Sequence, residues 1–316
     1  PYTTLFRSQY LLNLEKGDLH QIRDAREMDK SSPSDRQVCV MTLEEFSNEK
    51  TIPHKTGFIR NLQHHSACKL EAFSDCTQGI IRVPRRTSGN LSEKQIGFYL
   101  DEDRLILIED SGFLLPFMKS LEKTPLGRCT LSYLIQTLLE SLIEDDALDL
   151  ERLEDKLAKI EENLLRRIPD SFYATVIAYR RELTSLRAFY EQMMNIGDQM
   201  QASIGHELDE RELAGWKLFV SRCDRLHSHV EMLKEYLLQI RELYQSQIEV
   251  QQNKVMTFLT IVTTIFMPLT LIAGWFGMNF PNMLMFQWKY GYLFVILLSV
   301  SIVVAEFFYF RRKKML

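Results

Sequence analysis

The chain has 316 residues, of which 46% are hydrophobic and 25% are charged, and its formal net charge is −4. A net negative charge gives no support for nucleic-acid binding, which needs basic surface. Five cysteines form no C-x-x-C pair, which predicts reduced thiols rather than a disulfide framework. The averages hide a partition, because charge is abundant up to Lys254 and almost absent from there to Phe310.

The first part of the chain carries the strand signals. Short apolar runs at residues 38–41 and 79–83 are typical of strands. Residues 96–100 and 105–108 flank Asp101-Glu102-Asp103, which predicts a hairpin with an acidic turn. These signals vanish from about residue 124 onward. We therefore predict an α/β domain over residues 1–123.

The next part, residues 124–254, reads as long helices. Apolar spacing predicts one helix over 126–167, ended by Pro169, and a second over 171–204. From about 209 to 275 only Pro268 interrupts the pattern. A continuous helix of ~65 residues would be ~100 Å long, and such a length indicates a coiled coil, a membrane stalk or both. Rearrangement of the soluble part could then move the segment that follows.

Two apolar stretches, residues 255–275 and 290–310, are each about 21 residues long, or ~31 Å as a helix, which matches the hydrocarbon core of a bilayer. We expect transmembrane helices at 255–276 and 290–310, joined by an external loop at 277–289 and followed by a basic tail at 311–316. Arg311-Arg312-Lys313-Lys314 closes the second span, whereas the loop offers only Lys289. The positive-inside rule places the tail and the N-terminal domain in the cytoplasm. No secretory signal is recognisable before the soluble part, so we expect a multi-pass protein of the cytoplasmic membrane.

One face of the first span is mixed in character. For a helix that advances 100° per residue, seven residues fall within an arc of about 80°: Met256, Leu259, Thr263, Met267, Thr270, Gly274 and Gly277. Small and Thr residues let membrane helices pack closely, which is one interpretation. The other is a pore lining, and since one helix cannot enclose a pore, this requires several copies around an axis.

The end of the first span reads Phe266-Met267-Pro268-Leu269-Thr270-Leu271-Ile272-Ala273-Gly274-Trp275-Phe276-Gly277-Met278-Asn279-Phe280. This resembles the signature of the CorA family of divalent-cation channels, in which Gly-Met-Asn closes the first membrane helix and opens a short periplasmic loop. Here the tripeptide follows M-P-L-T-x-I-A-G in an uncharged span and precedes one further span and a basic tail. The resemblance covers the C-terminal third closely, and the long helix and the α/β start agree with it.

The resemblance implies an α+β fold with very long stalk helices and a two-helix membrane hairpin, assembled as a funnel-shaped homopentamer in the lipid bilayer. It implies a selectivity filter at Gly277, Met278 and Asn279, with Asn253 at the cytoplasmic mouth. The implied lumen is lined by Met256, Leu259, Thr263, Met267, Thr270 and Gly274. It further implies influx of magnesium, with cobalt and nickel as additional candidate ions, and gating by cytoplasmic magnesium. Neither an enzymatic activity nor an organic cofactor is expected.

This chemistry suits magnesium, which gives up its water reluctantly and prefers octahedral oxygen coordination. A ring of Asn279 amides and Gly277 carbonyls could hydrogen-bond the waters of the hydrated ion, and rings of Met256 and Leu259 could close by dewetting. The family usually carries acidic residues after Gly-Met-Asn. Residues 280–289 contain none, so cations are concentrated more weakly at the outer mouth. The alternative is the related ZntB-like branch of zinc transporters, although that branch typically varies the residue found here as Met278.

Other charged residues allow two interpretations each. Acidic residues concentrate at Glu140, Glu144, Asp145, Asp146, Asp149, Glu151, Glu154 and Asp155. They are either a solvated helix face or regulatory magnesium ligands, as the resemblance implies for carboxylates on cytoplasmic helices. Glu306 lies within the second span, where we expect it to snorkel or pair with the basic tail, the other interpretation being a proton-linked or ion-linked role. No nucleophile, acid–base or nucleotide-binding motif predicts an enzyme.

Overall fold

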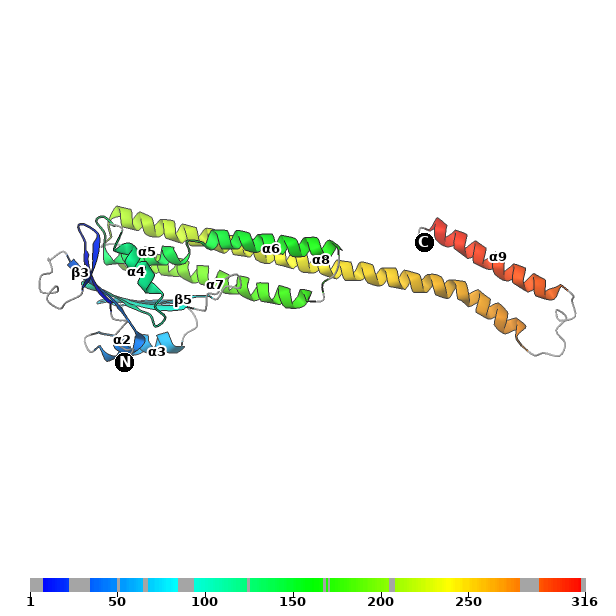
Figure 1. The fold of residues 1–316 in the computed structure, drawn as a ribbon, viewed down its shortest axis with the longest axis horizontal. Helices are drawn as coiled ribbons and strands as arrows, with labels where there is room; N and C mark the ends of the chain where they lie inside the picture. Colours follow the sequence, from blue (N-terminus) through cyan, green and yellow to red (C-terminus); the bar gives the residue numbers. More distant parts are fainter. Residues whose placement is uncertain are drawn as a thin grey trace. The chain divides into compact units, whose positions relative to one another are not determined.

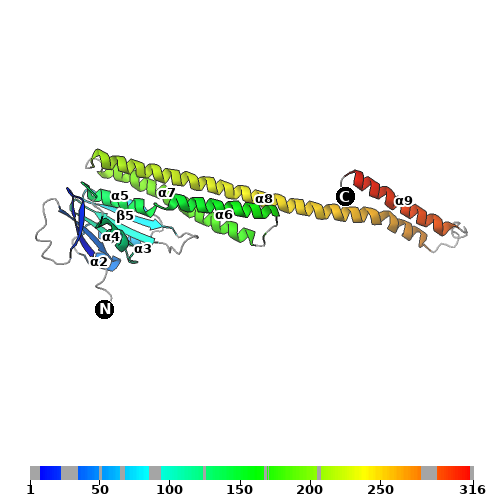
Figure 2. The ribbon, with the colours of Figure 1, turned by 45° about the horizontal axis from the view of Figure 1, so that its top comes forward.

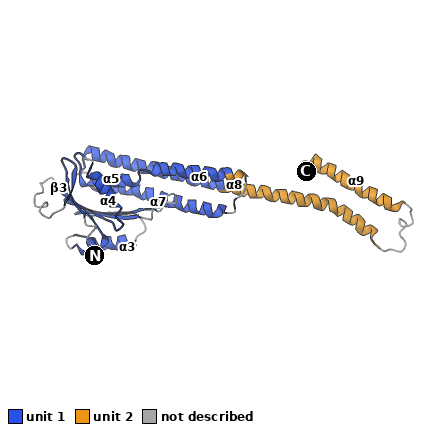
Figure 3. Ribbon diagram, viewed as in Figure 1, with its two compact units in different colours: residues 1–162, 169–240 blue, residues 163–168, 241–316 orange. Residues whose placement is uncertain are grey.

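The computed structural model describes residues 8–22, 35–49, 52–64, 68–84, 94–123, 126–166, 169, 171–204, 208–278 and 290–313. The chain divides into two compact units (Figure 3). The first contains Pro1–Glu162 and Pro169–Ile240, and the second contains Asn163–Ile168 and Arg241–Leu316.

The first unit is built on a sheet of seven described strands. In chain order these are β1 (Ser8–Asn13), β2 (Asp18–Ile22), β3 (Asp35–Met41), β4 (Lys69–Ala72), β5 (Thr77–Val83), β6 (Lys94–Leu100) and β7 (Arg104–Ile108). The strand order is β2-β1-β3-β7-β6-β5-β4, and neighbours run antiparallel except for the parallel pair β3–β7. The predicted hairpin is confirmed, because Leu100 pairs with Leu105 and the Asp101 carboxylate accepts hydrogen bonds from the N–H groups of Asp103 and Arg104.

Both faces of this sheet are buried, since side chains alternate between faces along a strand. One face contributes Cys39, Ile80, Tyr99, Ile106 and Ile108 to a core with two helices, α2 (Leu43–Asn48) and α3 (Lys55–His64). The residues between them, such as Val38, Ile81, Phe98 and Leu107, are also buried, and they belong to the opposite face. Figure 1 shows α2 and α3 on one side of the sheet and the remaining helices of the unit on the other.

Strands β1, β2 and β4 were not predicted. Strand β1 alternates buried Tyr10 and Leu12 with half-buried Gln9 and Leu11, which is the expected period of two. It contains no β-branched residue, and Tyr10 is its one residue of high strand propensity, so the propensity signal is weak. The strand is held instead by tertiary pairing on both sides, with β2 and with β3.

Beyond the sheet come α4 (Leu114–Leu121), α5 (Leu131–Leu142), α6 (Asp146–Arg166), α7 (Phe172–Ile204) and α8 (Glu210–Phe276). The predicted single helix over 126–167 is wrong, because the chain breaks between α5 and α6. Asp146 begins α6 and is buried, and its carboxylate accepts a hydrogen bond of 2.7 Å from the Tyr190 hydroxyl on α7. A carboxylate is favoured at a helix N-terminus, so Asp146 both starts a helix and joins α6 to α7. The predictions for α7 and for the long α8 are confirmed.

Helices α6, α7 and the first half of α8 form a three-helix coiled coil, and they lie side by side in Figures 1 and 2. The buried residues of α8 alternate spacings of three and four, the heptad pattern of a coiled-coil seam: Trp216, Phe219, Cys223, Leu226, Val230, Leu233, Leu237 and Ile240. His229 pairs with Glu154 at 3.5 Å, and the Tyr236 hydroxyl donates to Glu161. Because both pairs advance by seven residues on each helix, α6 and α8 run parallel.

The second unit contains the rest of α8 and α9 (Gly291–Arg312). Both helices are long and apolar enough to cross a membrane, as predicted for the C-terminal hairpin. Figures 1 and 2 show α9 returning alongside the membrane half of α8. The shielded residues of α9 gather on one side of the helix, mostly three or four positions apart: Gly291, Val295, Ser299, Ile302, Val303, Glu306 and Phe310.

Candidate functional site

The residues predicted to line a pore lie along one exposed face of α8. Asn253, Met256, Leu259, Thr263, Met267, Thr270 and Gly274 are all on this helix and all exposed, and Gly277 and Met278 follow it directly. Met256 is 62% exposed and Met267 is 66% exposed, which is unusual for large apolar side chains in a folded chain. Asn279, the third residue of the predicted filter, lies outside the described residues.

The opposite face of the same helix is shielded. Its half-buried residues are Thr257, Ile261, Val262, Ile265, Pro268, Leu269, Ile272 and Phe276. At 100° per residue their directions centre about 180° from Met256 and Gly274. The shielding within the chain is therefore on the side opposite the predicted lumen, and the predicted lumen face itself is uncovered.

Two threonines on the uncovered face, Thr263 and Thr270, donate their hydroxyl protons to backbone carbonyls of the same helix. Thr263 donates to the Leu259 carbonyl at 2.8 Å, and Thr270 donates to the Phe266 carbonyl at 2.7 Å. A hydroxyl keeps two lone pairs when its proton is donated to the backbone. These oxygens therefore present acceptors to whatever lies on this face. Acceptors suit the water molecules of a hydrated cation, because those waters donate outward.

The uncovered face also carries a hollow near the C-terminal end of α8. This shallow hollow is lined by Thr263, Phe266, Met267, Thr270, Leu271, Gly274, Trp275 and Met278. Phe266, Leu271 and Trp275 were not predicted to line the site. Strict 100° spacing places them outside the 80° arc, but large side chains at its borders reach over it.

The two glycines on this face differ in why they are glycine. A Cβ on Gly277 would lie 2.8 Å from the Ala273 carbonyl oxygen, a contact that real side chains do not make. Gly277 is therefore required by the end of α8 itself, where its own N–H bonds that carbonyl at 2.8 Å. A Cβ on Gly274 would meet nothing within 4 Å. Nothing in the single chain requires Gly274, although glycine in a helix interior costs about 0.5–1 kcal/mol relative to alanine.

The acidic residues of α5 and α6 form no metal site within the described part of the chain, where no three ligating side chains gather. Asp146 bonds Tyr190, Asp149 pairs with Arg152 at 3.1 Å, and Glu154 pairs with His229. These carboxylates hold the coiled coil together or pair along their own helix. The regulatory ligands expected from the resemblance are not assigned to residues.

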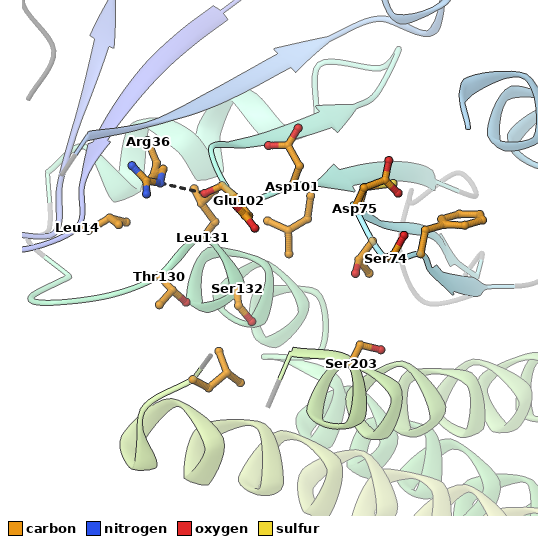
Figure 4. A pocket seen from close by; sticks show the side chains of 15 residues that line it. Leu14, Arg36, Ser74, Asp75, Asp101, Glu102, Thr130, Leu131, Ser132 and Ser203 are labelled. Carbon is orange, nitrogen blue, oxygen red and sulfur yellow. Dashed lines mark hydrogen bonds between the residues drawn. The ribbon is translucent and has the colours of Figure 1, made fainter. Parts of the chain in front are cut away.

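A separate cavity of about 450 Å³ lies in the first unit, between the sheet and the helices. Figure 4 shows Asp75, Asp101 and Glu102 on one wall and Thr130, Ser132 and Ser203 on the other. Most of these groups are already satisfied. Asp101 accepts from its own turn and from Arg104 at 2.6 Å, and the Thr130 hydroxyl donates to Glu212 at 3.0 Å. The cavity offers few free polar groups to a ligand.

The second half of α8 and the whole of α9 are two apolar helices that fit a membrane hairpin. One face of α8, with threonine, methionine and glycine residues, is uncovered, and its opposite face is shielded. A family model, CorA-like Mg2+ transporter protein, matches residues 41–312. The chain belongs to this family.

Individual relatives support the assignment at different levels. The cobalt/magnesium transport protein CorA of Thermotoga maritima is 29% identical over 184 residues, which cover 58% of this chain and 52% of that protein. The magnesium transport protein CorA of Wolinella succinogenes is 42% identical over 77 residues, 24% of each chain. The first of these matches thus spans about half the length of the curated relative, and the second spans a quarter.

Solved structures show the same fold across the whole chain. The CorA magnesium transporter of Methanocaldococcus jannaschii aligns over 98% of both chains with a TM-score of 0.76 at 18% identity. Full-length CmaX aligns over 97% of both chains with a TM-score of 0.75, also at 18% identity. The predicted α/β domain, long helix and C-terminal hairpin are thereby confirmed as the architecture of this family.

Proposed function

We propose that the chain assembles as a homopentameric channel in the cytoplasmic membrane and admits magnesium to the cytoplasm, with cobalt and nickel as further candidate ions. Both termini lie on the cytoplasmic side. The hydrated ion is selected at Gly277, Met278 and Asn279, passes the lumen lined by α8 and reaches the cytoplasm at Asn253. Cytoplasmic magnesium gates this path. Membership of a magnesium transporter family supports the class of ion.

The observation that carries this proposal is the uncovered face of α8. A lumen formed by several copies requires one face of each helix to be free of contacts within its own chain. The face of Met256, Thr263 and Thr270 is free in this way, whereas the opposite face is shielded. Hydroxyl acceptors along it match the outward-pointing hydrogens of a hydrated ion. Magnesium holds its waters tightly, so acceptors for those waters serve it better than direct ligands.

The outer end of this path is the proposed filter. Asn279 supplies an amide oxygen and Gly277 supplies a backbone carbonyl that no side chain obstructs. The apolar constriction at Met256 and Leu259 lies toward the cytoplasm and closes the path by dewetting. The driving force is ample, because a divalent ion gains about 4.6 kcal/mol across 100 mV.

Magnesium influx into proteoliposomes tests the filter. We expect Asn279→Ala to reduce influx at least tenfold under a membrane potential, measured with a magnesium-sensitive dye. Asn163→Ala, an exposed asparagine in the cytoplasmic helix region, is the matched control and should leave influx unchanged. Undiminished influx through Asn279→Ala would remove Asn279 from the filter.

The zinc alternative is tested in the same vesicles by competition among magnesium, cobalt, nickel and zinc. We expect magnesium to be transported and cobalt and nickel to compete with it. Zinc flux that collapses with the pH gradient, with magnesium inert, would assign the chain to the ZntB-like activity instead.

A further inference from the structure

The cytoplasmic end of α9 carries three consecutive basic residues, Arg311, Arg312 and Lys313, and all three are exposed. The sequence suggested that Glu306 would pair with them. Within the described residues no ion pair joins Glu306 to this tail, and one carboxylate oxygen of Glu306 is enclosed without a hydrogen-bond partner. The expected local neutralisation is therefore absent from the described part of the hairpin.

Helix geometry explains the separation. Phe310 is 3% exposed and marks the covered side of α9. Glu306, four residues earlier, shares that side. Arg311 and Arg312 are turned about 100° and 200° away from Phe310, so they point along the flank and to the side opposite the cover. The one intramembrane carboxylate of this described helix and the two arginines thus lie on different sides of it.

Lys313 is turned about 300° from Phe310, so it lies on the flank opposite Arg311, and its side chain is exposed. Its ammonium group lies 5.3 Å from the centre of the Tyr309 ring, a cation–π contact. Tyrosine prefers the level of the lipid headgroups, where its ring meets hydrocarbon and its hydroxyl meets water. Tyr309 therefore holds Lys313 at the depth where phosphate groups lie.

From this arrangement we propose that Arg311, Arg312 and Lys313 form a binding site for the phosphate of anionic phospholipids in the cytoplasmic leaflet. The inference rests on the membrane placement of α9 in the proposed function, but not on ion transport. Three exposed cations that fan out around the cytoplasmic end of α9 complement the anionic headgroups of the lipids around it, and each basic residue near such a surface strengthens binding about fivefold. A planar guanidinium can bind two phosphate oxygens at once.

The full-length protein in mixed phosphatidylglycerol and phosphatidylcholine nanodiscs provides the test. After gentle extraction, native mass spectrometry counts the phosphatidylglycerol molecules retained per chain. We expect enrichment of phosphatidylglycerol over its bulk fraction, reduced at least tenfold in the triple variant Arg311→Gln, Arg312→Gln, Lys313→Gln. The matched control removes three exposed cations of the first unit, by Lys159→Gln, Arg180→Gln and Lys217→Gln, and should retain full enrichment.

The triple variant removes positive charges and can therefore disturb the insertion of α9 into the membrane, so a second variant that keeps the charges is needed. Arg311→Lys with Arg312→Lys keeps the positive-inside signal, and it should retain enrichment with a loss of only a few fold. Equal retention of both lipids by the unmodified chain would overturn the proposal, as would displacement of phosphatidylglycerol by millimolar inorganic phosphate. Absence of magnesium flux would overturn the channel without affecting this result.

Discussion

The two halves of α8 form one continuous helix, but only the first half has buried side chains. Over residues 210–240 every apolar seam position, from Trp216 to Ile240, is buried within the first unit. Over residues 241–276 no residue is buried, and large apolar side chains such as Met256 and Met267 are exposed. A soluble core explains the first half completely. The second half makes sense only with a surrounding that the single chain does not supply.

That surrounding has two parts. One side of the second half is already half-buried within the unit that also contains α9, while lipid can cover an apolar flank. On the face with Thr263 and Thr270, each hydroxyl oxygen keeps acceptor lone pairs that lipid tails cannot hydrogen-bond. Water can donate hydrogen bonds to these oxygens, as it would in the proposed pore.

The largest expected effect is on the covered half. Trp216 is fully buried, and its indole N–H donates to the Ser132 hydroxyl at 3.2 Å. We expect Trp216→Ala to lower the free energy of unfolding by about 3–5 kcal/mol, measured by urea unfolding of the detergent-solubilised chain. Lys217→Ala, at the next and exposed position, should change it by less than about 0.5 kcal/mol. Equal effects would show that the seam is not a core.

The second-largest effect on stability is expected from the hydrogen bond between Tyr190 of α7 and Asp146 of α6. Tyr190→Phe removes the hydroxyl that donates to the buried Asp146 carboxylate, and it should cost about 1–3 kcal/mol because a buried acceptor loses a partner. Tyr173→Phe alters a tyrosine that is 55% exposed and should be close to neutral. If both variants unfold at the wild-type urea concentration, Asp146 does not depend on Tyr190.

Alkaline pH should weaken the covered half through Cys223. Burial, followed by the nearby Asp146 carboxylate, raises the pKa of this thiol from 9.0 to about 12. Since the pKa is higher in the folded chain, the associated stability is complete below pH 9 and is lost as the pH rises toward 12. At about pH 10.5 we expect a loss of about 2 kcal/mol relative to about pH 8.5. Unfolding curves of Cys223→Ala should lack this component, and an identical pH dependence in that variant would contradict the assignment.

The smallest effect on stability is expected on the uncovered half. Gly274→Ala has room for its Cβ and gains helix propensity. The free energy of unfolding should therefore stay the same or rise by about 0.5–1 kcal/mol. Magnesium flux should nevertheless fall, because the methyl group would enter the proposed lumen. Gly277→Ala is the contrast, since its Cβ collides with the Ala273 carbonyl and should disturb the end of α8 itself. Unaltered flux through Gly274→Ala would place that residue outside the lumen.

Sequence patterns predicted the helices better than the sheet. The seam of α8, the long α7 and the two spans follow from apolar spacing and length, which are local signals. Strand β1 depends on pairing with β2 and β3, which no local window shows. The start of α6 does carry a local signal, the acidic residues Asp145, Asp146 and Asp149, but the apolar spacing continues across it. The helix face of the candidate site was predictable for the same reason as the seam, whereas the different roles of Gly274 and Gly277 required coordinates.

Glu306 shows the same limit. Its closeness in sequence to Arg311 suggested a pair, but a separation of five residues turns the two side chains about 140° apart on a helix. The carboxylate consequently shares the covered side with Phe310.

The central claim is that the exposed face of α8 lines the ion path, and cysteine accessibility measures this most directly. Single variants Thr263→Cys and Thr270→Cys place thiols on that face, whereas Ile265→Cys and Ile272→Cys place them on the shielded one. Four of the five native cysteines are buried and Cys68 is half-buried in the first unit, so the wild type is the control. We predict that silver or cadmium ions block magnesium flux at the threonine positions and not at the isoleucine positions. Block at the isoleucine positions alone, or no difference between the faces, would contradict the account.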